Sequence, residues 1–363
     1  MMQQTIKVLV TDDSFFMRKL ITDMLNDHPF IEVVDTAKNG ADLLEKLTQF
    51  TPDVITLDVE MPIMDGLSVL KKMMKENPIP TIMLSSTTKE GAHNTIKAME
   101  LGAFDFVLKP SGAISIDLYK VKEELISKII HASKTSIKPL LTYKWNVQNN
   151  RLKEKKTSIL YKDAQQTDSK NSRNDQSIIA IGTSTGGPRA LQQVLTSLPG
   201  SIHAPIFIVQ HMPPGFTKSL SERLNSLCKI NVVEAEHHMN VLPNTAYIAP
   251  GGYHMEVICL EDSRLVIHLN ESPPIKGHRP SVDVLFHSIS QLARKKVITI
   301  LTGMGSDGAK GIKAIKDKGS AYIIAESEQT TIVNGMPKAA RETGLVDEVV
   351  ELTDIASVIM TKI

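Results

Sequence analysis

The chain has 363 residues, which is too long for one ordinary domain core, so two domains are expected. Its composition, 42% hydrophobic and 22% charged with a formal net charge of +1, is typical of a soluble globular protein and does not favour nucleic-acid binding. Its 2 cysteines are too few for a disulfide framework, no apolar run approaches the ~20 residues that cross a bilayer, and the first residues contain no signal-peptide core, so we expect a cytoplasmic protein without direct membrane insertion.

Charge divides the chain into three parts. Residues 1–126 contain 13 Lys/Arg and 19 Asp/Glu, residues 127–176 contain 11 and 4, and residues 177–363 contain 17 and 17. The middle part is also rich in Ser, Thr, Asn and Gln, and few of its residues could build a core. We therefore predict a flexible basic linker over 127–176, between domains at 4–126 and 177–363. A nucleic-acid arm is disfavoured, because the basic residues are not interleaved with aromatic ones.

Strand-like and helix-like segments alternate along the first domain. Short apolar runs with strand character occupy residues 6–10, 31–34, 54–57, 81–84 and 106–108. Helical spacing separates them, and Ser14 is placed to cap the first helix. This alternation predicts an α/β fold, a doubly wound parallel sheet of the (βα)5 type. Ligands of such sheets bind beyond the carboxyl ends of the strands.

Charged side chains follow several of these predicted strands. Asp12 and Asp13 come after the first strand, Asp58 ends the third, and Lys109 follows the fifth. Three carboxylates at one rim suit a hard cation, most plausibly Mg²⁺. A cation there would offset their mutual repulsion and stabilise an arriving phosphoryl group, whose oxygens an ammonium can bind.

These residues, with Met61-Pro-Ile-Met-Asp-Gly66, Ser85 and Lys109-Pro110, resemble a two-component receiver domain. The resemblance implies that Asp58 accepts phosphate from a histidine kinase. It also implies that Mg²⁺ is held by carboxylates and one carbonyl, from Asp12, Asp13, Asp58 and Glu60. It further implies the remaining roles at the rim: Ser85 as the switch hydroxyl, Lys109 as the phosphoryl partner and Phe106 as the switch aromatic residue.

The second domain begins with a buried strand and a glycine-rich turn. Four apolar residues, 178–181, precede Gly182-x-Ser184-x-Gly186, and Pro188 then stands where a helix would start. This spacing fits a nucleophile elbow, but a phosphate-binding loop or a structural turn gives a similar pattern. A dinucleotide site needs an acidic residue after the next strand. That strand ends in Gln210-His211, which favours acid–base chemistry instead.

A third strand end supplies a possible partner for these two residues. The apolar run 298–301 leads to a glycine-flanked Asp307. If the strands are parallel, Ser184, His211 and Asp307 emerge at one edge and could form a catalytic triad. Asp283 could replace Asp307, and other histidines are available as bases: His237, His238, His254, His268, His278 and His287.

Several motifs of the second domain resemble the family of chemotaxis response-regulator methylesterases. They are residues 181–187, 210–216, 248–251, 278–286, 301–308 and 334–338. The resemblance implies a parallel-sheet α/β methylesterase domain, a serine hydrolase that demethylates glutamate methyl esters on methyl-accepting chemoreceptors and deamidates glutamines. The implied catalytic residues are Ser184, His211 and Asp307, without a cofactor at the esterase site. Backbone N–H groups near Thr185 and Met304 are candidates for the oxyanion hole.

Two other classes of function are alternatives to the esterase. One is a phospho-regulated, non-catalytic binding module with a nucleotide or partner site at the glycine-rich loop. The other, a DNA-binding output domain, is disfavoured because no basic helix-turn-helix pattern is present. For the esterase we also expect regulation, in which the first domain covers the Ser184 rim until Asp58 is phosphorylated.

Overall fold

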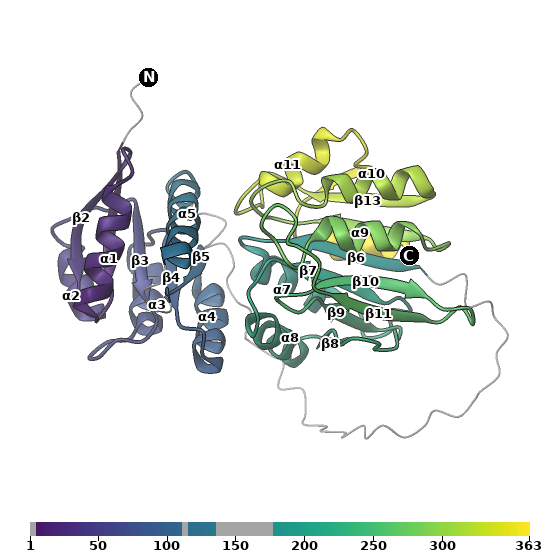
Figure 1. Cartoon of the computed structure of the whole chain (residues 1–363), viewed down its shortest axis with the longest axis horizontal. Helices are drawn as coiled ribbons and strands as arrows, with labels where there is room; N and C mark the ends of the chain where they lie inside the picture. The colour runs from purple at the N-terminus through teal and green to yellow at the C-terminus, as the bar shows by residue number, and fades with distance from the viewer. Residues whose placement is uncertain (1–4, 111–114, 136–176) are drawn as a thin grey trace.

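The structure is a computed structural model, and it describes residues 5–110, 115–135 and 177–363. Two units lie side by side, the N-terminal one on the left of Figure 1 and the C-terminal one on the right. None of the helices in these described ranges is long and apolar enough to span a bilayer.

The N-terminal unit is a five-stranded parallel sheet in the order β2-β1-β3-β4-β5, so the predicted (βα)5 fold is confirmed. Val8 and Val10 of β1 pack with α1 and α5 on one face, whereas Leu9 packs on the opposite face, which α3 and α4 cover. The elements are β1 (Ile6–Thr11), α1 (Phe15–Asn26), β2 (Ile31–Ala37), α2 (Gly40–Lys46), β3 (Val54–Asp58), α3 (Gly66–Glu76), β4 (Thr81–Ser85), α4 (Lys89–Leu101), β5 (Asp105–Leu108) and α5 (Ser115–Ala132).

The start of α1 and the end of α5 can each be explained by particular residues. The Ser14 side chain accepts a hydrogen bond from the Met17 N–H, as expected of the predicted cap. Helix α5 continues to Ala132, because Ile129 and Ala132 are buried in the core. The predicted boundary at residue 126 therefore falls inside α5. Most of the predicted linker, residues 136–176, lies outside the described residues.

The C-terminal unit contains a seven-stranded parallel sheet in the order β14-β13-β12-β6-β7-β9-β8 and an antiparallel β10–β11 hairpin. The predicted parallel-sheet α/β class is confirmed here too. The elements are β6 (Ile178–Thr183), α7 (Gly187–Ser197), β7 (Ile206–Gln210), α8 (Phe216–Leu227), β8 (Asn231–Glu234), β9 (Thr245–Ile248), β10 (His254–Cys259), β11 (Leu265–Asn270), α9 (Val282–Ser290), β12 (Lys296–Ile300), α10 (Ala309–Lys318), β13 (Ala321–Glu326), α11 (Gly335–Glu342), β14 (Glu348–Val350) and α12 (Ile355–Lys362).

Strand β6 lies at the centre of this sheet and is buried on both faces. Ile179 and Ile181 pack with α7, α8 and α12, whereas Ile178 and Ala180 pack with α9, α10 and the hairpin. Burial on both faces explains why the strand is a continuous apolar run rather than an alternating one. Its neighbours are β12 and β7, both parallel to it, so the chain leaves all three strands at the same edge.

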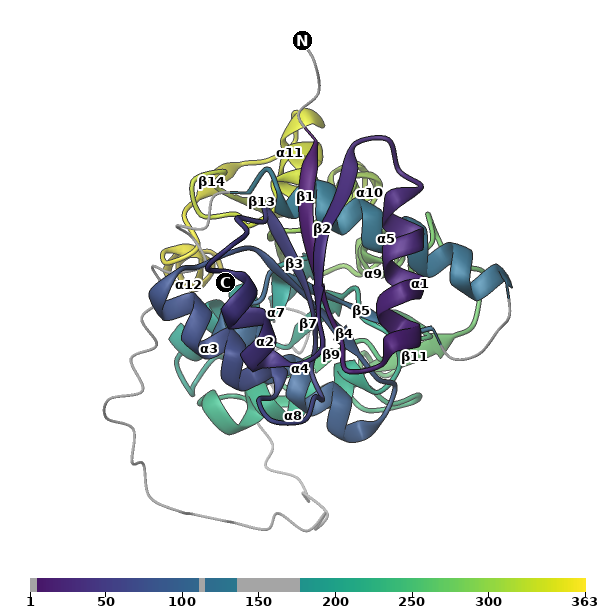
Figure 2. The same ribbon diagram turned by 90° about the vertical axis from the view of Figure 1, so that its left-hand side faces the viewer.

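The two units meet along α4 and β5 of the first and α7 and α8 of the second (Figures 1 and 2). The Phe106 ring stacks on Phe216, with ring centroids 4.7 Å apart. Arg223 of α8 donates two hydrogen bonds to the Glu100 carboxylate of α4, at 2.5 and 3.1 Å. The apolar core is continuous across this interface, so the units are packed together rather than merely tethered.

Candidate active site and phosphorylation site

Ser184 lies in a tight turn at the carboxyl end of β6. Its N–H donates to the Thr302 carbonyl at 3.0 Å, which ties the turn to the residue that follows β12. Its own carbonyl accepts hydrogen bonds from the Gly187 N–H at 2.8 Å and from Gln210 Nε2 at 3.0 Å. The backbone of Ser184 is thus held from three sides.

Two glycines let the chain approach this serine closely. Gly186 has a φ of +79°, which L side chains rarely adopt. Gly303 runs beside the turn, and a Cβ built on it would lie 2.8 Å from the Ser184 Cβ, closer than two carbons can pack. Gly186 and Gly303 are therefore required where the turn after β6 packs against the segment after β12.

His211 and Asp307 are joined directly. His211 Nε2 lies 2.8 Å from Asp307 Oδ2. The carboxylate also accepts hydrogen bonds from the N–H groups of Val282 and Asp283, at 2.7 and 2.9 Å. Burial alone would raise the pKa of Asp307, but the hydrogen bond and charge of His211, together with these N–H groups, hold it well below its usual range. Asp307 is therefore an anion that orients the imidazole.

Asp283, the other candidate carboxylate, binds backbone N–H groups rather than His211. Its Oδ1 accepts hydrogen bonds from the Gly308 and Gly311 N–H groups, at 2.9 and 2.8 Å. It therefore supports the start of α10, whereas the contact with His211 belongs to Asp307. Sequence spacing left these two carboxylates open, and the geometry separates them.

The second nitrogen of His211 decides what the imidazole can do. Because Nε2 bonds to the carboxylate, it carries the hydrogen, and Nδ1 keeps its lone pair. Nδ1 is buried and has no hydrogen-bond partner within the described part of the chain. Ser184 and His211 line the same cavity of about 970 Å³, although no hydrogen bond joins them among the described residues. Catalytic hydrogen bonds often form only once substrate is bound, and Nδ1 is the nitrogen left to act as a base.

His278 stacks on His211, with ring centroids 3.9 Å apart and planes within 7°. Burial, followed by the nearby His211, lowers the pKa of His278 to about 4, so it is neutral above that pH. A neutral ring can support His211 without repelling its imidazolium. Sequence reasoning named His278 only as an alternative base.

The N–H groups of Thr185 and Met304, the oxyanion-hole candidates, have no hydrogen-bond partner among the described residues. Both residues line the cavity that holds Ser184. The Thr185 hydroxyl donates to Asp105 Oδ2 of the first unit at 2.5 Å. Sequence reasoning missed Asp105, because a contact over 80 residues leaves no local pattern.

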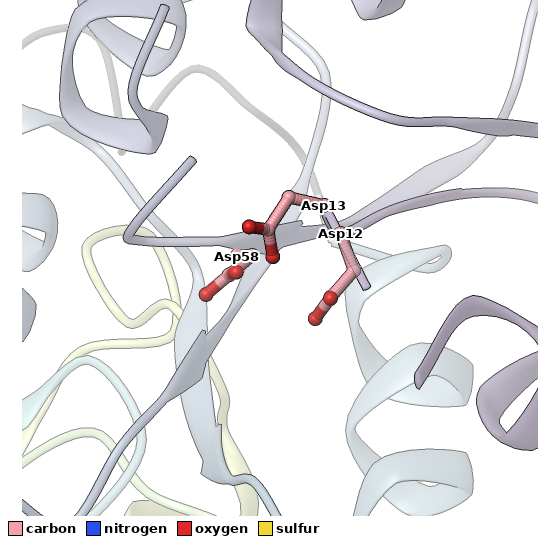
Figure 3. A group of neighbouring side chains, drawn as sticks. All are labelled: Asp12, Asp13 and Asp58. Carbon is pink, nitrogen blue, oxygen red and sulfur yellow. The ribbon is translucent and has the colours of Figure 1, made fainter. Parts of the chain in front are cut away.

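In the first unit, Asp12, Asp13 and Asp58 converge at the strand ends (Figure 3), and one carboxylate oxygen of each lies within 4.8 Å of the others. Lys109 Nζ bridges two of them, 2.8 Å from Asp12 and 2.7 Å from Asp58. Burial raises the pKa of Asp58 to about 6, opposed by Lys109 and reinforced by Asp12. A hard cation would fit these oxygens and relieve that effect.

Three predicted residues of the first unit lie around this cluster. The Glu60 N–H donates to Asp58 Oδ1 at 3.3 Å. The Ser85 hydroxyl is buried and accepts a hydrogen bond from Thr95 of α4 at 2.7 Å, rather than bonding to Asp58. Phe106 faces the second unit, where it stacks on Phe216. Ser85 is therefore linked to α4, and Phe106 is part of the domain interface.

Comparison with known proteins gives matches over both units. The CheB methylesterase family model matches residues 179–359, and the response regulator receiver domain model matches residues 8–117. The protein-glutamate methylesterase/protein-glutamine glutaminase of Halalkalibacterium halodurans is 55% identical, over 99% of this chain and 99% of the relative. The same-named protein of Geobacillus kaustophilus is 50% identical, over 98% of each chain. The crystal structure of the Thermotoga maritima CheB methylesterase catalytic domain is similar over 52% of this chain and 100% of that chain, with 39% identity and a TM-score of 0.51.

The raised pKa of Asp58 predicts a pH-dependent loss of stability. The folded carboxyl, with a pKa of about 6, holds its proton at pH values where the unfolded one, at 3.8, has lost it. Stability therefore falls as pH rises through this window, by on the order of 2 kcal/mol from this group. Asp58→Asn removes the effect. The free energy of unfolding of this variant, relative to that of the wild type, should therefore increase between about pH 4 and pH 7.5. Urea unfolding without divalent cations measures this difference.

Mg²⁺ should reduce the difference at neutral pH, because it favours the ionised wild-type carboxylate. Stability curves for the two proteins that run parallel across the pH range would contradict the assignment.

Proposed function

Because the chain belongs to the CheB methylesterase family, with a receiver domain ahead of the esterase domain, we propose that it hydrolyses glutamate methyl esters on chemoreceptors. The family predicted from the sequence motifs is confirmed. The chain is a phosphorylation-regulated esterase of the protein-glutamate methylesterase and glutaminase class, and the non-catalytic binding module is not favoured.

Hydrolysis begins with proton transfer to His211. Nδ1 takes the proton of the Ser184 hydroxyl as its oxygen attacks the γ-carbonyl carbon of the ester. Asp307 stabilises the imidazolium through Nε2. The observation that supports this assignment is the His211–Asp307 hydrogen bond at 2.8 Å, which leaves Nδ1 without a partner among the described residues, on a side chain that lines the cavity of Ser184.

The intermediate then collapses and the methoxy group leaves as methanol, taking the proton from His211. Water, deprotonated by the same nitrogen, attacks the acyl-enzyme and restores the receptor's glutamate carboxylate and the Ser184 hydroxyl. A glutamine side chain would follow the same course and release ammonia. The N–H groups of Thr185 and Met304, which have no partner among the residues that the structure describes, are suited to bind the negative oxygen of each tetrahedral intermediate.

At the receiver, we expect Asp58 to accept the phosphoryl group from a chemotaxis histidine kinase. Mg²⁺, held by Asp12, Asp13, Asp58 and the Glu60 carbonyl, would neutralise charge there. Lys109 would bind a phosphoryl oxygen, since its ammonium already lies 2.7 Å from Asp58. The kinase, the Mg²⁺ ion, the chemoreceptor substrates and a cytoplasmic location are all part of this proposal.

Regulation follows from where the receiver sits. Its residues Asp105 and Phe106 contact Thr185 and Phe216, so it forms one wall of the cavity that contains Ser184. A receptor helix is about 10 Å wide and needs that side of the esterase open. Phosphorylation of Asp58 would activate the esterase by destabilising the docked arrangement relative to an undocked one.

The catalytic assignment predicts a large loss of activity in Ser184→Ala. We expect methanol release from methylated receptor membranes to fall by roughly 10⁴-fold or more, because the nucleophile is lost. Ser306→Ala is the matched control: Ser306 lies next to Asp307, but the one hydrogen bond of its hydroxyl among the described residues comes from Lys276, so the rate of this variant should stay within about twofold of wild type. A Ser184→Ala variant as active as this control would refute the mechanism.

Labelling separates the esterase from a non-catalytic binding module. A serine-reactive phosphonate should attach to the wild-type chain at Ser184 and fail to attach to Ser184→Ala, as measured by mass spectrometry of the intact protein. Absence of labelling in the activated wild-type protein would favour the binding module.

The docked arrangement predicts that charge reversals at the interface activate the unphosphorylated protein. Arg223→Glu or Glu100→Arg places like charges where a double hydrogen bond now holds α8 to α4. Basal methanol release should rise by up to about tenfold in each single variant. The combined variant Glu100→Arg/Arg223→Glu restores opposite charges and should return the rate toward wild type. Single variants that keep the wild-type basal rate would contradict control by docking.

A further inference from the structure

Glu326 is a buried carboxyl that the mechanism above does not use. It ends β13 and is 0% exposed. Its Oε2 accepts a hydrogen bond from the Thr302 N–H at 2.7 Å, and its Oε1 accepts one from the Thr330 hydroxyl at 3.1 Å. No ion pair within the described ranges includes it. A carboxyl buried without a counter-charge is costly, so it needs an explanation other than stability.

Thr302, the residue that Glu326 holds, contacts both sides of the nucleophile. Its carbonyl accepts the Ser184 N–H at 3.0 Å and the Thr183 hydroxyl at 2.9 Å. Its hydroxyl donates to the Thr185 carbonyl at 3.0 Å and accepts the Val333 N–H at 2.9 Å. Thr302 therefore holds the turn on both sides of Ser184, and Glu326 in turn binds the Thr302 N–H.

We propose that Glu326 is a positioning residue of the esterase, which fixes the backbone of Ser184 and Thr185 through Thr302. This inference rests on the proposed function, because it concerns the same reaction. Thr302 follows β12, beyond the last residue paired with β13, so the ladder itself does not fix its N–H. Without Glu326, that N–H has no acceptor and the turn can shift. A displacement of about 1 Å at a reacting atom can cost roughly 100-fold in rate.

The protonation state of Glu326 determines which substitution resembles it most closely. Burial raises the pKa of Glu326 to about 7, although the Thr302 N–H and the Thr330 hydroxyl oppose the shift. At pH 6 the side chain is therefore mainly a neutral acid. Glutamine then matches it in shape and charge, with an amide oxygen for the Thr302 N–H and an amide group for Thr330.

The experiment measures kcat and KM for methanol release at pH 6, with the phosphorylated full-length protein and methylated receptor membranes. Glu326→Ala should lower kcat at least tenfold and leave KM within about twofold, because the residue does not touch the substrate. Glu326→Gln should restore kcat to within about twofold of wild type. Thr330→Val is the matched control: it removes the other partner of Glu326 but keeps the link to Thr302, so its kcat should also stay within about threefold.

Two results would overturn the proposal: an Ala variant with wild-type kcat, or a Gln variant as slow as the Ala variant. If Glu326→Ala does not fold, Glu326→Asp takes its place. Its shorter side chain stays polar but cannot reach the Thr302 N–H, so kcat should fall, and wild-type kcat in this variant would defeat the idea. A wild-type protein that releases no methanol would instead count against the proposed function.

Discussion

The hydrogen bond from His211 Nε2 to Asp307 Oδ2 is the interaction on which the proposed chemistry depends. It fixes the hydrogen on Nε2 and leaves Nδ1 as the nitrogen with a free lone pair, on a residue that lines the cavity of Ser184. The strand order makes this bond possible, because β12, β6 and β7 are adjacent and parallel. The neutral ring of His278 stacks on this imidazole and supports it.

Control of this centre converges on strand β5. Lys109, just beyond its carboxyl end, contacts Asp58, the proposed phosphate acceptor, whereas Asp105 at its start contacts Thr185, which follows the proposed nucleophile Ser184. Phe106, between them, stacks on Phe216 at the start of α8. One short strand thus touches both sites, and a change of charge at Asp58 has a direct structural route to the docked interface. Under the proposed regulation, the same contacts would let the receiver both cover the esterase and respond to phosphorylation.

Much of this arrangement was predictable from the sequence, because it depends on local patterns. Apolar runs and glycine turns indicated the parallel sheets, and the rule that ligands bind at strand ends directed attention to Ser184, His211 and Asp307. The roles of Asp105, His278 and Glu326 were not predictable in this way. Asp105 meets Thr185 through domain packing, His278 meets His211 across a loop, and Glu326 ends an apolar strand where nothing nearby indicates its contact with Thr302. The choice between His211 nitrogens also needed coordinates.

The most direct test of the account is ¹⁵N NMR of the His211 imidazole in the full-length protein at neutral pH. Assignment requires a His211→Gln sample, in which the corresponding signals disappear. The account predicts a hydrogen on Nε2 and an unprotonated Nδ1, with both nitrogens protonated once a phosphonate is bound to Ser184. A ring that carries its hydrogen on Nδ1 in the free protein would contradict the assignment of that nitrogen as the base.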